Sequence, residues 1–223
     1  MFKDKTWIIL GLVVALLAPA GAYGTLYTET FNSGSSVGAI PNGSPVGVTF
    51  RGTVNNIPPA LTVGGLTVQL NISGGFNGSL YAYLVAPNGT LVVLMNQPGV
   101  TDDNPFGAYG SGMNITLQDG TSTHGSIQNE DSGSALSGTY NAAGTLANFN
   151  GSAADGTWSL YFSDLASGGG TSTLNSWSLN ISAVPEPVNT ALLAMGGVFA
   201  LVNGCRWWLN HRALGNAPSL RTP

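Results

Sequence analysis

The middle of the chain alternates apolar and polar residues, a pattern that predicts β-strands. In Leu66–Ser73 the apolar side chains recur at every second position, and three later segments repeat this period. A period of two places successive side chains on opposite faces of a sheet, so one face of each strand is predicted to be buried. The four segments are Leu66–Ser73, Met113–Gln118, Trp158–Ser163 and Trp177–Ser182.

A hairpin is predicted where two further apolar runs flank a short turn. Leu80–Val85 and Thr90–Leu94 are separated by Ala86-Pro-Asn-Gly89, and Asn-Gly tolerates the positive φ of a tight turn. No helical periodicity is found between Tyr23 and Ala183. Short strands separated by Gly, Asn, Ser and Pro favour an all-β fold, and we expect residues 23–183 to form an antiparallel β-sandwich.

The first 22 residues are typical of an export signal. Lys3 and Lys5 precede the apolar stretch Trp7–Leu17, and small residues around Ala22 suit a signal peptidase. The apolar stretch has 11 residues, too few for the roughly 20 that span a membrane. We therefore expect residues 1–22 to be a signal peptide, cleaved after Ala22. Because Cys205 is the only cysteine, an intramolecular disulfide is excluded.

The C-terminal part begins with Pro185-Glu186-Pro187 and continues with 18 uncharged residues, Val188–Cys205, and a basic end at Arg206 and Arg212. An apolar run with bases on one side predicts a transmembrane helix whose far end is cytoplasmic. Two asparagines and three glycines weaken this run, so a buried helix of the sandwich is the alternative. The prolines disfavour helix before the run and leave an extended, accessible strip, and residues 213–223 are predicted to be a disordered tail.

Val184-Pro-Glu-Pro187, an apolar helix and an Arg-bearing end, in this order, resemble the PEP-CTERM sorting signal of Gram-negative bacteria. The resemblance covers residues 184–212. It implies that a membrane exosortase recognises the segment and cleaves near Pro185, Glu186 and Pro187. The protein would then stay transiently in the inner membrane before release to the cell surface or extracellular matrix. The tail beyond Arg212 is longer than is usual in that family.

The predicted strands carry a second resemblance. Phe149-x-Gly151-x4-Gly156-x-Trp158-x-Leu160 and Leu174-x2-Trp177-Ser-Leu179, with the Ala86–Thr90 turn, resemble the P/Homo B domain of subtilisin-like proprotein convertases. The similarity runs from about Ile40 to Ser182 and implies a β-sandwich of jelly-roll type. Trp158 and Trp177 each alternate with apolar neighbours, so we expect both rings in the core between the sheets.

The same resemblance implies calcium, because bacterial members often hold it with acidic loop residues. The matching residues are Asp119, Asp155 and Asp164. Calcium takes six to eight oxygen ligands, and no EF-hand spacing is found. Asp102-Asp103-Asn104 or Glu130-Asp131 could serve as ligands equally or not at all. In the alternative the carboxylates only solvate loops, and Asp164 accepts hydrogen bonds from the Gly168–Gly170 turn.

Charge excludes one class of partner. Charged residues make up 7% of the chain, against about 25% in ordinary soluble domains. Between Tyr23 and Ala183 the sequence contains eight acidic residues and a single base, Arg51. Phosphate binding needs clustered Lys and Arg, so nucleic acid is not expected as a partner.

The sequence offers little for catalysis. Gly34-Ser-Ser36-Val-Gly38 has the spacing of a nucleophile elbow, but that element requires a strand before it and a helix after it. His124 is the only histidine between Tyr23 and Ala183, and it lies in a segment predicted to be an exposed loop. Neither a Ser-His-Asp triad nor a zinc site finds further support, so we expect no enzyme activity.

Three functions remain. The first is a non-catalytic surface or matrix protein with an adhesive or structural role. The second is a carbohydrate-binding module, which predicts that at least two tyrosines line one exposed strip. The third is an accessory to a separate subtilisin-like serine protease. The tyrosines considered for stacking on extracellular polysaccharide are Tyr81, Tyr83, Tyr109 and Tyr161.

Overall fold

A computed structural model describes residues 24–215, although not the side chains of 187–190, 193 and 209–215. The predicted signal peptide, 1–22, lies outside the described residues, as do 216–223. The described chain is predominantly β-structure, which confirms the all-β class. The strands are β1 (Thr25–Phe31), β2 (Gly38–Ile40), β3 (Ser44–Val54), β4 (Leu61–Ser73), β5 (Leu80–Val85), β6 (Leu91–Asn96), β7 (Met113–Gln118), β8 (Leu136–Asn141), β9 (Gly156–Asp164) and β10 (Ser172–Pro185).

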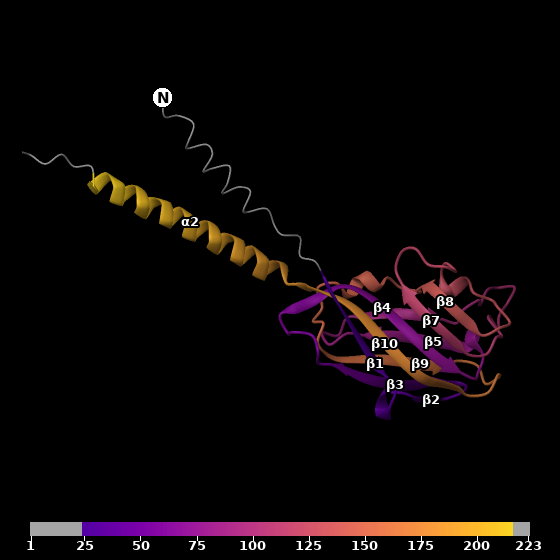
Figure 1. Cartoon of the computed structure of the whole chain (residues 1–223). Helices are drawn as coiled ribbons and strands as arrows, with labels where there is room; N and C mark the ends of the chain where they lie inside the picture. Colours follow the sequence, from indigo (N-terminus) through magenta and orange to yellow (C-terminus); the bar gives the residue numbers. More distant parts are fainter. Residues whose placement is uncertain (1–23, 216–223) are drawn as a thin grey trace, which may run out of the picture. The chain divides into compact units, whose positions relative to one another are not determined.

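The strands form two sheets (Figure 1). One has the order β1-β10-β4-β7-β8, with β2 also paired to β10, and the other has the order β3-β9-β5-β6. The expectation of a wholly antiparallel sandwich is wrong at one place, because β7 and β8 are parallel, with Met113 opposite Leu136. The long connection between them returns the chain to the end at which β7 began, which is what a parallel pair requires.

Both sheets contribute to one buried core. Trp158 of β9 is fully buried, and its indole N–H donates to the Ala154 carbonyl at 3.4 Å. Trp177 of β10 is also buried, donates to the Ser36 carbonyl at 2.8 Å and packs on Phe31 with ring centroids 4.3 Å apart. Each ring therefore buries a large apolar area without leaving its N–H unpaired.

The alternating segments become strands as their period predicts. In β5 and β6 the predicted hairpin forms, with Val85 opposite Leu91 and Gly89 at φ +86° in the turn. Along β5 the even positions are buried and the odd positions half-buried. This separation leaves one side of β5 for the core and the other for the surface.

Residues 24–184 form one compact unit, and the helix α2 (Pro187–Gly215) belongs to another. Strand β10 ends at Pro185, Glu186 is exposed, and Pro187 begins α2, a first-turn position that proline suits. Both Arg206 and Arg212 lie in α2, which continues to Gly215. Residues 213–215, predicted to belong to a disordered tail, are therefore helical.

The predicted transmembrane helix is not found. Helix α2 has 29 residues, but no helix in the described range 24–215 combines sufficient length with an apolar stretch able to cross a membrane. The asparagines, glycines and arginines within α2 lower its mean hydropathy.

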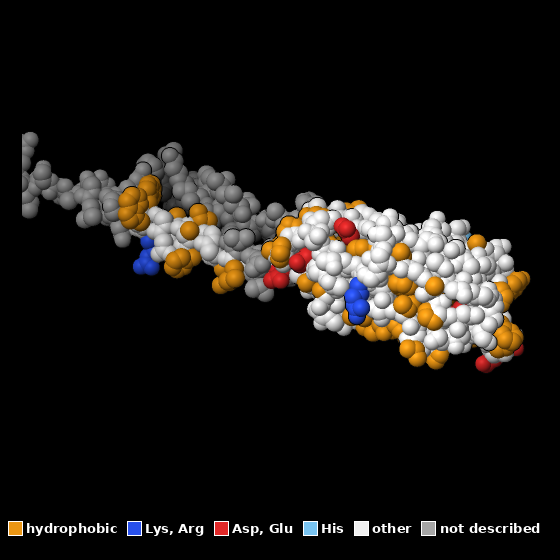
Figure 2. All heavy atoms as spheres, turned by 90° about the horizontal axis from the view of Figure 1, so that it is seen from below, with side chains coloured by type: hydrophobic (Ala, Val, Ile, Leu, Met, Phe, Trp, Pro, Cys, Tyr) orange, Lys and Arg blue, Asp and Glu red, His pale blue; other side chains and the backbone are white. Residues whose placement is uncertain are grey.

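The surface of the β-sandwich has few charges. On the face that Figure 2 presents, most atoms of the sandwich belong to the backbone or to uncharged polar side chains, and only a few acidic or basic side chains interrupt them. Such a surface favours recognition by stacking and neutral hydrogen bonds over recognition by charge.

Candidate functional site

The first candidate site is the outer face of the four-stranded sheet. On β5, Leu80, Ala82 and Leu84 point into the core and are fully buried. Tyr81 and Tyr83 occupy the alternate positions, so their rings lie on the opposite, outer side. The alternation that builds the core thus also directs two aromatic rings toward the surface.

A third tyrosine joins them from the neighbouring strand. Tyr161 of β9 lies directly opposite Tyr83, and residues opposite each other in an antiparallel pair share a face. The two rings stack with centroids 4.5 Å apart and planes 12° from parallel. Tyr81 meets both edge-on, at 6.1 Å from Tyr83 and 6.3 Å from Tyr161. We call Tyr81, Tyr83 and Tyr161 the tyrosine cluster.

The surroundings hold these rings in place. The Tyr161 hydroxyl donates to the Pro45 carbonyl at 2.8 Å. Burial raises the pKa of the Tyr83 hydroxyl above its usual value, and the neighbouring hydroxyls of Tyr161 and Tyr81 add to the effect. On β3, Thr49 faces Tyr161, and Arg51 lies one row further along the same face. The cluster is therefore neutral and pre-oriented, with one base beside it.

The structure brings together three of the four tyrosines considered from the sequence. Tyr109 is 65% exposed and lies elsewhere, in the loop between β6 and β7, where its ring lies against the Gly133 backbone. The condition set for a carbohydrate-binding surface was at least two tyrosines on one exposed strip; the tyrosine cluster lies on one strip, but its three side chains are half-buried.

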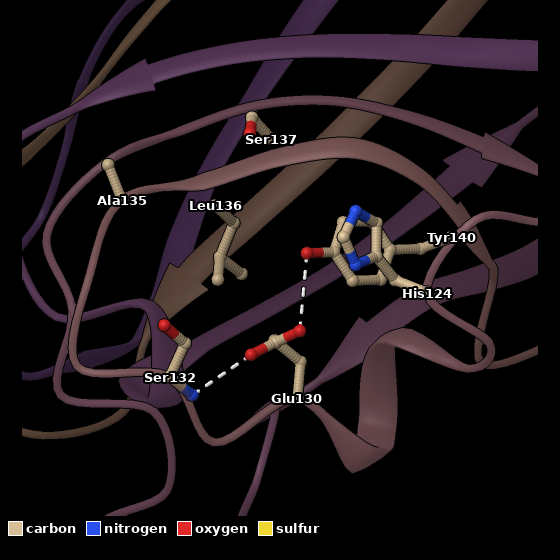
Figure 3. Close-up of a pocket in the computed structure, with 7 residues that line it drawn as sticks. All are labelled: His124, Glu130, Ser132, Ala135, Leu136, Ser137 and Tyr140. Atoms are coloured by element: carbon tan, nitrogen blue, oxygen red, sulfur yellow. Dashed lines mark hydrogen bonds between the residues drawn. The ribbon is translucent and has the colours of Figure 1, made fainter.

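A second group of polar side chains lines a pocket (Figure 3). The Glu130 carboxylate accepts the Tyr140 hydroxyl at 3.2 Å on Oε2 and the Ser132 backbone N–H at 3.0 Å on Oε1. The His124 ring stacks on Tyr140, with centroids 4.8 Å apart and planes 19° from parallel. Burial, together with the charge of Glu130 and the hydrogen bond to it, raises the pKa of Tyr140 to about 12.

Sequence reasoning missed this second group because its members are separated along the chain. His124 was predicted to be an isolated loop residue, and Glu130 was considered only beside Asp131. The parallel pairing of β7 with β8, together with the hydrogen bond from the His124 N–H to the Thr139 carbonyl, places His124 beside Tyr140. A glycine at 138, φ +99°, leaves room for the imidazole, since a Cβ there would lie 2.7 Å from Nε2.

The three aspartates predicted to bind calcium are not brought together as one ligand set. Asp119 accepts the backbone N–H groups of Leu146 and Ala147 at 2.9 and 2.7 Å, which caps a short 3-10 helix. Asp155 precedes β9 and Asp164 ends it, so at about 3.3 Å per residue they are roughly 30 Å apart. One ion cannot be held by both.

Asp164 is fully buried, and its hydrogen-bond donor differs from the one predicted. Its Oδ1 accepts the Ala166 N–H at 3.3 Å, just before the Gly168–Gly170 turn that was expected to donate. Its Oδ2 has no hydrogen-bond partner within the described chain. Over residues 24–215 no three His, Cys, Asp or Glu side chains lie close enough to hold a metal ion.

The residues considered for nucleophilic catalysis make separate structural contacts and do not form a catalytic group. Gly34–Ser36 forms a 3-10 turn, and the Ser36 hydroxyl donates to the Arg51 carbonyl at 2.6 Å. The His124 ring instead contacts Tyr140. The strand-turn-helix of a nucleophile elbow is not formed at residues 34–38, because a short extended strand follows the turn.

Comparison with known proteins yields structural neighbours alone. No protein-family model matches the sequence, and no curated protein matches it. A solved complex of the Aeromonas sobria serine protease with its chaperone is 19% identical over 78% of this chain and 29% of that chain, with a TM-score of 0.44. The Aeromonas sobria serine protease solved without the chaperone is 19% identical over 75% and 29%, with a TM-score of 0.42. The match spans less than a third of each of those chains.

Proposed function

We propose that the chain is an exported, non-catalytic protein of the bacterial cell surface or extracellular matrix, whose β-sandwich adheres to polysaccharide through the tyrosine cluster. The observation that carries the proposal is the gathering of Tyr81, Tyr83 and Tyr161 on one outer sheet face. Aromatic rings with hydroxyl tips pack against the C–H faces of sugars and also reach their hydroxyls. Because the rings brace one another, little freedom is lost when a ligand binds.

Charge supports a neutral polysaccharide as the ligand. The outward positions of β3, β5, β6 and β9 carry no carboxylate and one base, Arg51. The sandwich as a whole holds eight acidic residues against that one base, which opposes binding of polyanions at low salt. A neutral glycan meets no such opposition.

Delivery to the surface is the second part of the proposal. The PEP-CTERM-like segment would be recognised by an exosortase-type enzyme, and the P/Homo B-like sandwich, of jelly-roll type, would be its cargo. Exposure of Glu186 in the single-residue gap between β10 and α2 supports access to the Pro-Glu-Pro sequence. Cleavage there would leave the sandwich, which ends at Val184, intact.

Binding is tested with the full chain and insoluble cellulose. The double variant Tyr83→Ala/Tyr161→Ala should reduce the fraction that sediments with cellulose, with affinity lowered at least about fivefold, because two aromatic contacts of about 0.5–1.5 kcal/mol each are lost. Phe106→Ala, which removes an aromatic ring that is 80% exposed and lies outside the cluster, is the control and should bind normally. Wild-type affinity in the double variant would refute the tyrosine cluster as the binding site.

Sorting is tested by expressing the chain with and without Pro185–Pro223 in a host that has an exosortase. The full chain should reach the surface or matrix fraction, whereas the shortened chain should be exported without being retained there. Equal surface retention of the two forms would contradict the proposed sorting signal.

A further inference from the structure

The pocket beside Glu130 is separate from the tyrosine cluster. It has a volume of about 250 Å³ and is open to solvent on one side. Its walls come from the loop before β8 and from β8 itself, whereas the tyrosine cluster lies on β5 and β9. A ligand bound in this pocket would therefore extend the proposed function without depending on the tyrosine cluster.

The pocket presents a fixed carboxylate. Two hydrogen bonds, from the Ser132 N–H and the Tyr140 hydroxyl, orient Glu130 (Figure 3). Because the pKa of Tyr140 is raised to about 12, its hydroxyl remains a donor at physiological pH. A carboxylate has about four lone-pair positions, so two stay available to a ligand.

No Lys or Arg side chain lines the pocket to neutralise this carboxylate. The other titratable side chains in its wall are Tyr140, which donates to Glu130, and His124, whose ring is stacked on Tyr140. A partly buried anion without a cationic neighbour attracts a positively charged ligand group, and a charge-assisted hydrogen bond to it is among the stronger polar contacts. The site therefore favours a cation.

The rest of the wall suits a sugar. Ser132 and Ser137 line the pocket and carry hydroxyls able to pair with sugar hydroxyls. Gly133, which follows Ser132, packs closely against the Tyr109 ring. A Cβ added at Gly133 would lie only 2.5 Å from that ring. Tyr109 is 65% exposed and so offers a flat apolar surface beside Gly133, the chain neighbour of the lining residue Ser132. A neighbouring sugar unit can stack there.

We propose that this pocket binds a protonated amino sugar, as found in a polysaccharide that bears free amines. The amine donates to Glu130, the ring hydroxyls pair with the serines, and the next sugar unit lies on Tyr109. A lysine side chain also carries an ammonium group, but its four-carbon stem needs an apolar channel. The hydroxyl-bearing wall favours the sugar over the lysine.

The test measures binding of a β-linked glucosamine oligomer to the full chain by calorimetry at low salt. We expect binding by the wild type and an affinity lowered at least tenfold in Glu130→Gln, which keeps an acceptor for Ser132. Asp131→Asn removes the adjacent, exposed carboxylate and should have little effect. Tyr109→Ala should weaken binding as well, and this variant leaves the Glu130 hydrogen bonds in place.

Ligand and site controls complete the design. The N-acetylated oligomer, with the same rings but no positive charge, should bind at least tenfold more weakly. The double variant Tyr83→Ala/Tyr161→Ala should retain glucosamine binding, so failure of the cellulose test and failure of this one are distinguishable. Equal binding of the acetylated oligomer, unchanged affinity in both Glu130→Gln and Tyr109→Ala, or tighter binding of a polylysine peptide would each overturn the proposal.

Discussion

Tyr140 couples its ionisation to folding because it is 2% exposed and donates to the charged Glu130. Its folded-state pKa is raised to about 12, whereas an unfolded tyrosine titrates near 10. The unfolded chain therefore loses this proton first as pH rises. The stabilisation is fully present below about pH 10 and is lost between about pH 10 and 12, up to about 2–3 kcal/mol.

Replacement of Tyr140 by Phe should remove this pH dependence. Urea unfolding at intervals from pH 9 to 12 measures the free energy of unfolding of the wild type and of Tyr140→Phe. The wild type should lose stability more steeply than the variant over this interval. Tyr109→Phe controls for the loss of an exposed hydroxyl, and parallel curves for wild type and Tyr140→Phe would contradict the prediction.

The contrast between the tyrosine cluster and the pocket shows which residue contacts follow from sequence. Tyr81 and Tyr83 alternate with buried residues in a recognisable strand, so a shared outer face could be predicted. The contact of Glu130 with Tyr140 depends on a parallel strand pair and on irregular loops, neither of which has a periodic signal. Asp119 resembled a metal ligand for the same reason, since its partner N–H groups are 27 and 28 residues away.

Among the strands, β3 depends on a glycine at a bulge. The register of β3 against β9 shifts between Ser44 and Val48, and Gly47 lies there at φ +61°. A Cβ at this position would overlap the Phe162 carbonyl and the Tyr161 ring. The residue must therefore supply both a left-handed conformation and a close approach of two strands.

Gly47→Ala should cost more stability than strain alone explains. Gly89 also has a positive φ, +86°, but a Cβ there would have no neighbour within 4 Å, so Gly89→Ala isolates the conformational strain. We expect about 1 kcal/mol for Gly89→Ala and more than about 3 kcal/mol for Gly47→Ala in urea unfolding. Similar losses in the two variants would show that the close approach to β9 is unimportant.

The alternation of apolar and polar residues located the strands well where no residue interrupted it. The hairpin and the segment Met113–Gln118 could be placed from sequence with near-correct ends. Four strands, β1, β2, β3 and β8, were not predicted. The alternation in β3 is broken by Gly47 and Gly52, and β1 is rich in threonine and mostly exposed. Pairing direction was wrong for β7 and β8, because a period of two is the same in parallel and antiparallel sheets.

The sandwich and α2 should behave as separate folding units. The hydrophobic core is built from residues between Phe31 and Ala183, and it includes none of the α2 side chains that the structure describes. A chain ending at Glu186 should therefore keep the thermal midpoint of the full chain, which calorimetry or circular dichroism can measure. A midpoint lowered by more than a few degrees would mean that α2 supports the sandwich.

For the whole molecule, the sequence correctly predicts the fold class, but the hydropathy of the C-terminal run Val188–Cys205 was overestimated. Alternation and turn residues sufficed to predict an all-β chain, because both reflect local backbone preferences. The membrane-spanning helix was inferred from 18 uncharged residues, yet absence of charge is a weaker condition than high mean hydropathy. The export signal was inferred from residues 1–22, which lie outside the described chain.

Strand β10 has a mechanical consequence for a protein held by its C-terminal segment. It runs 14 residues between β1 and β4 and ends one residue before α2. Force applied at that end acts along the strand, while its hydrogen bonds to both neighbours run across it. Many of these hydrogen bonds then carry the force together, in shear, and they do not break one after another as they would if the strand were peeled from its end. An anchored sandwich of this kind would resist flow and traction until the whole strand yields.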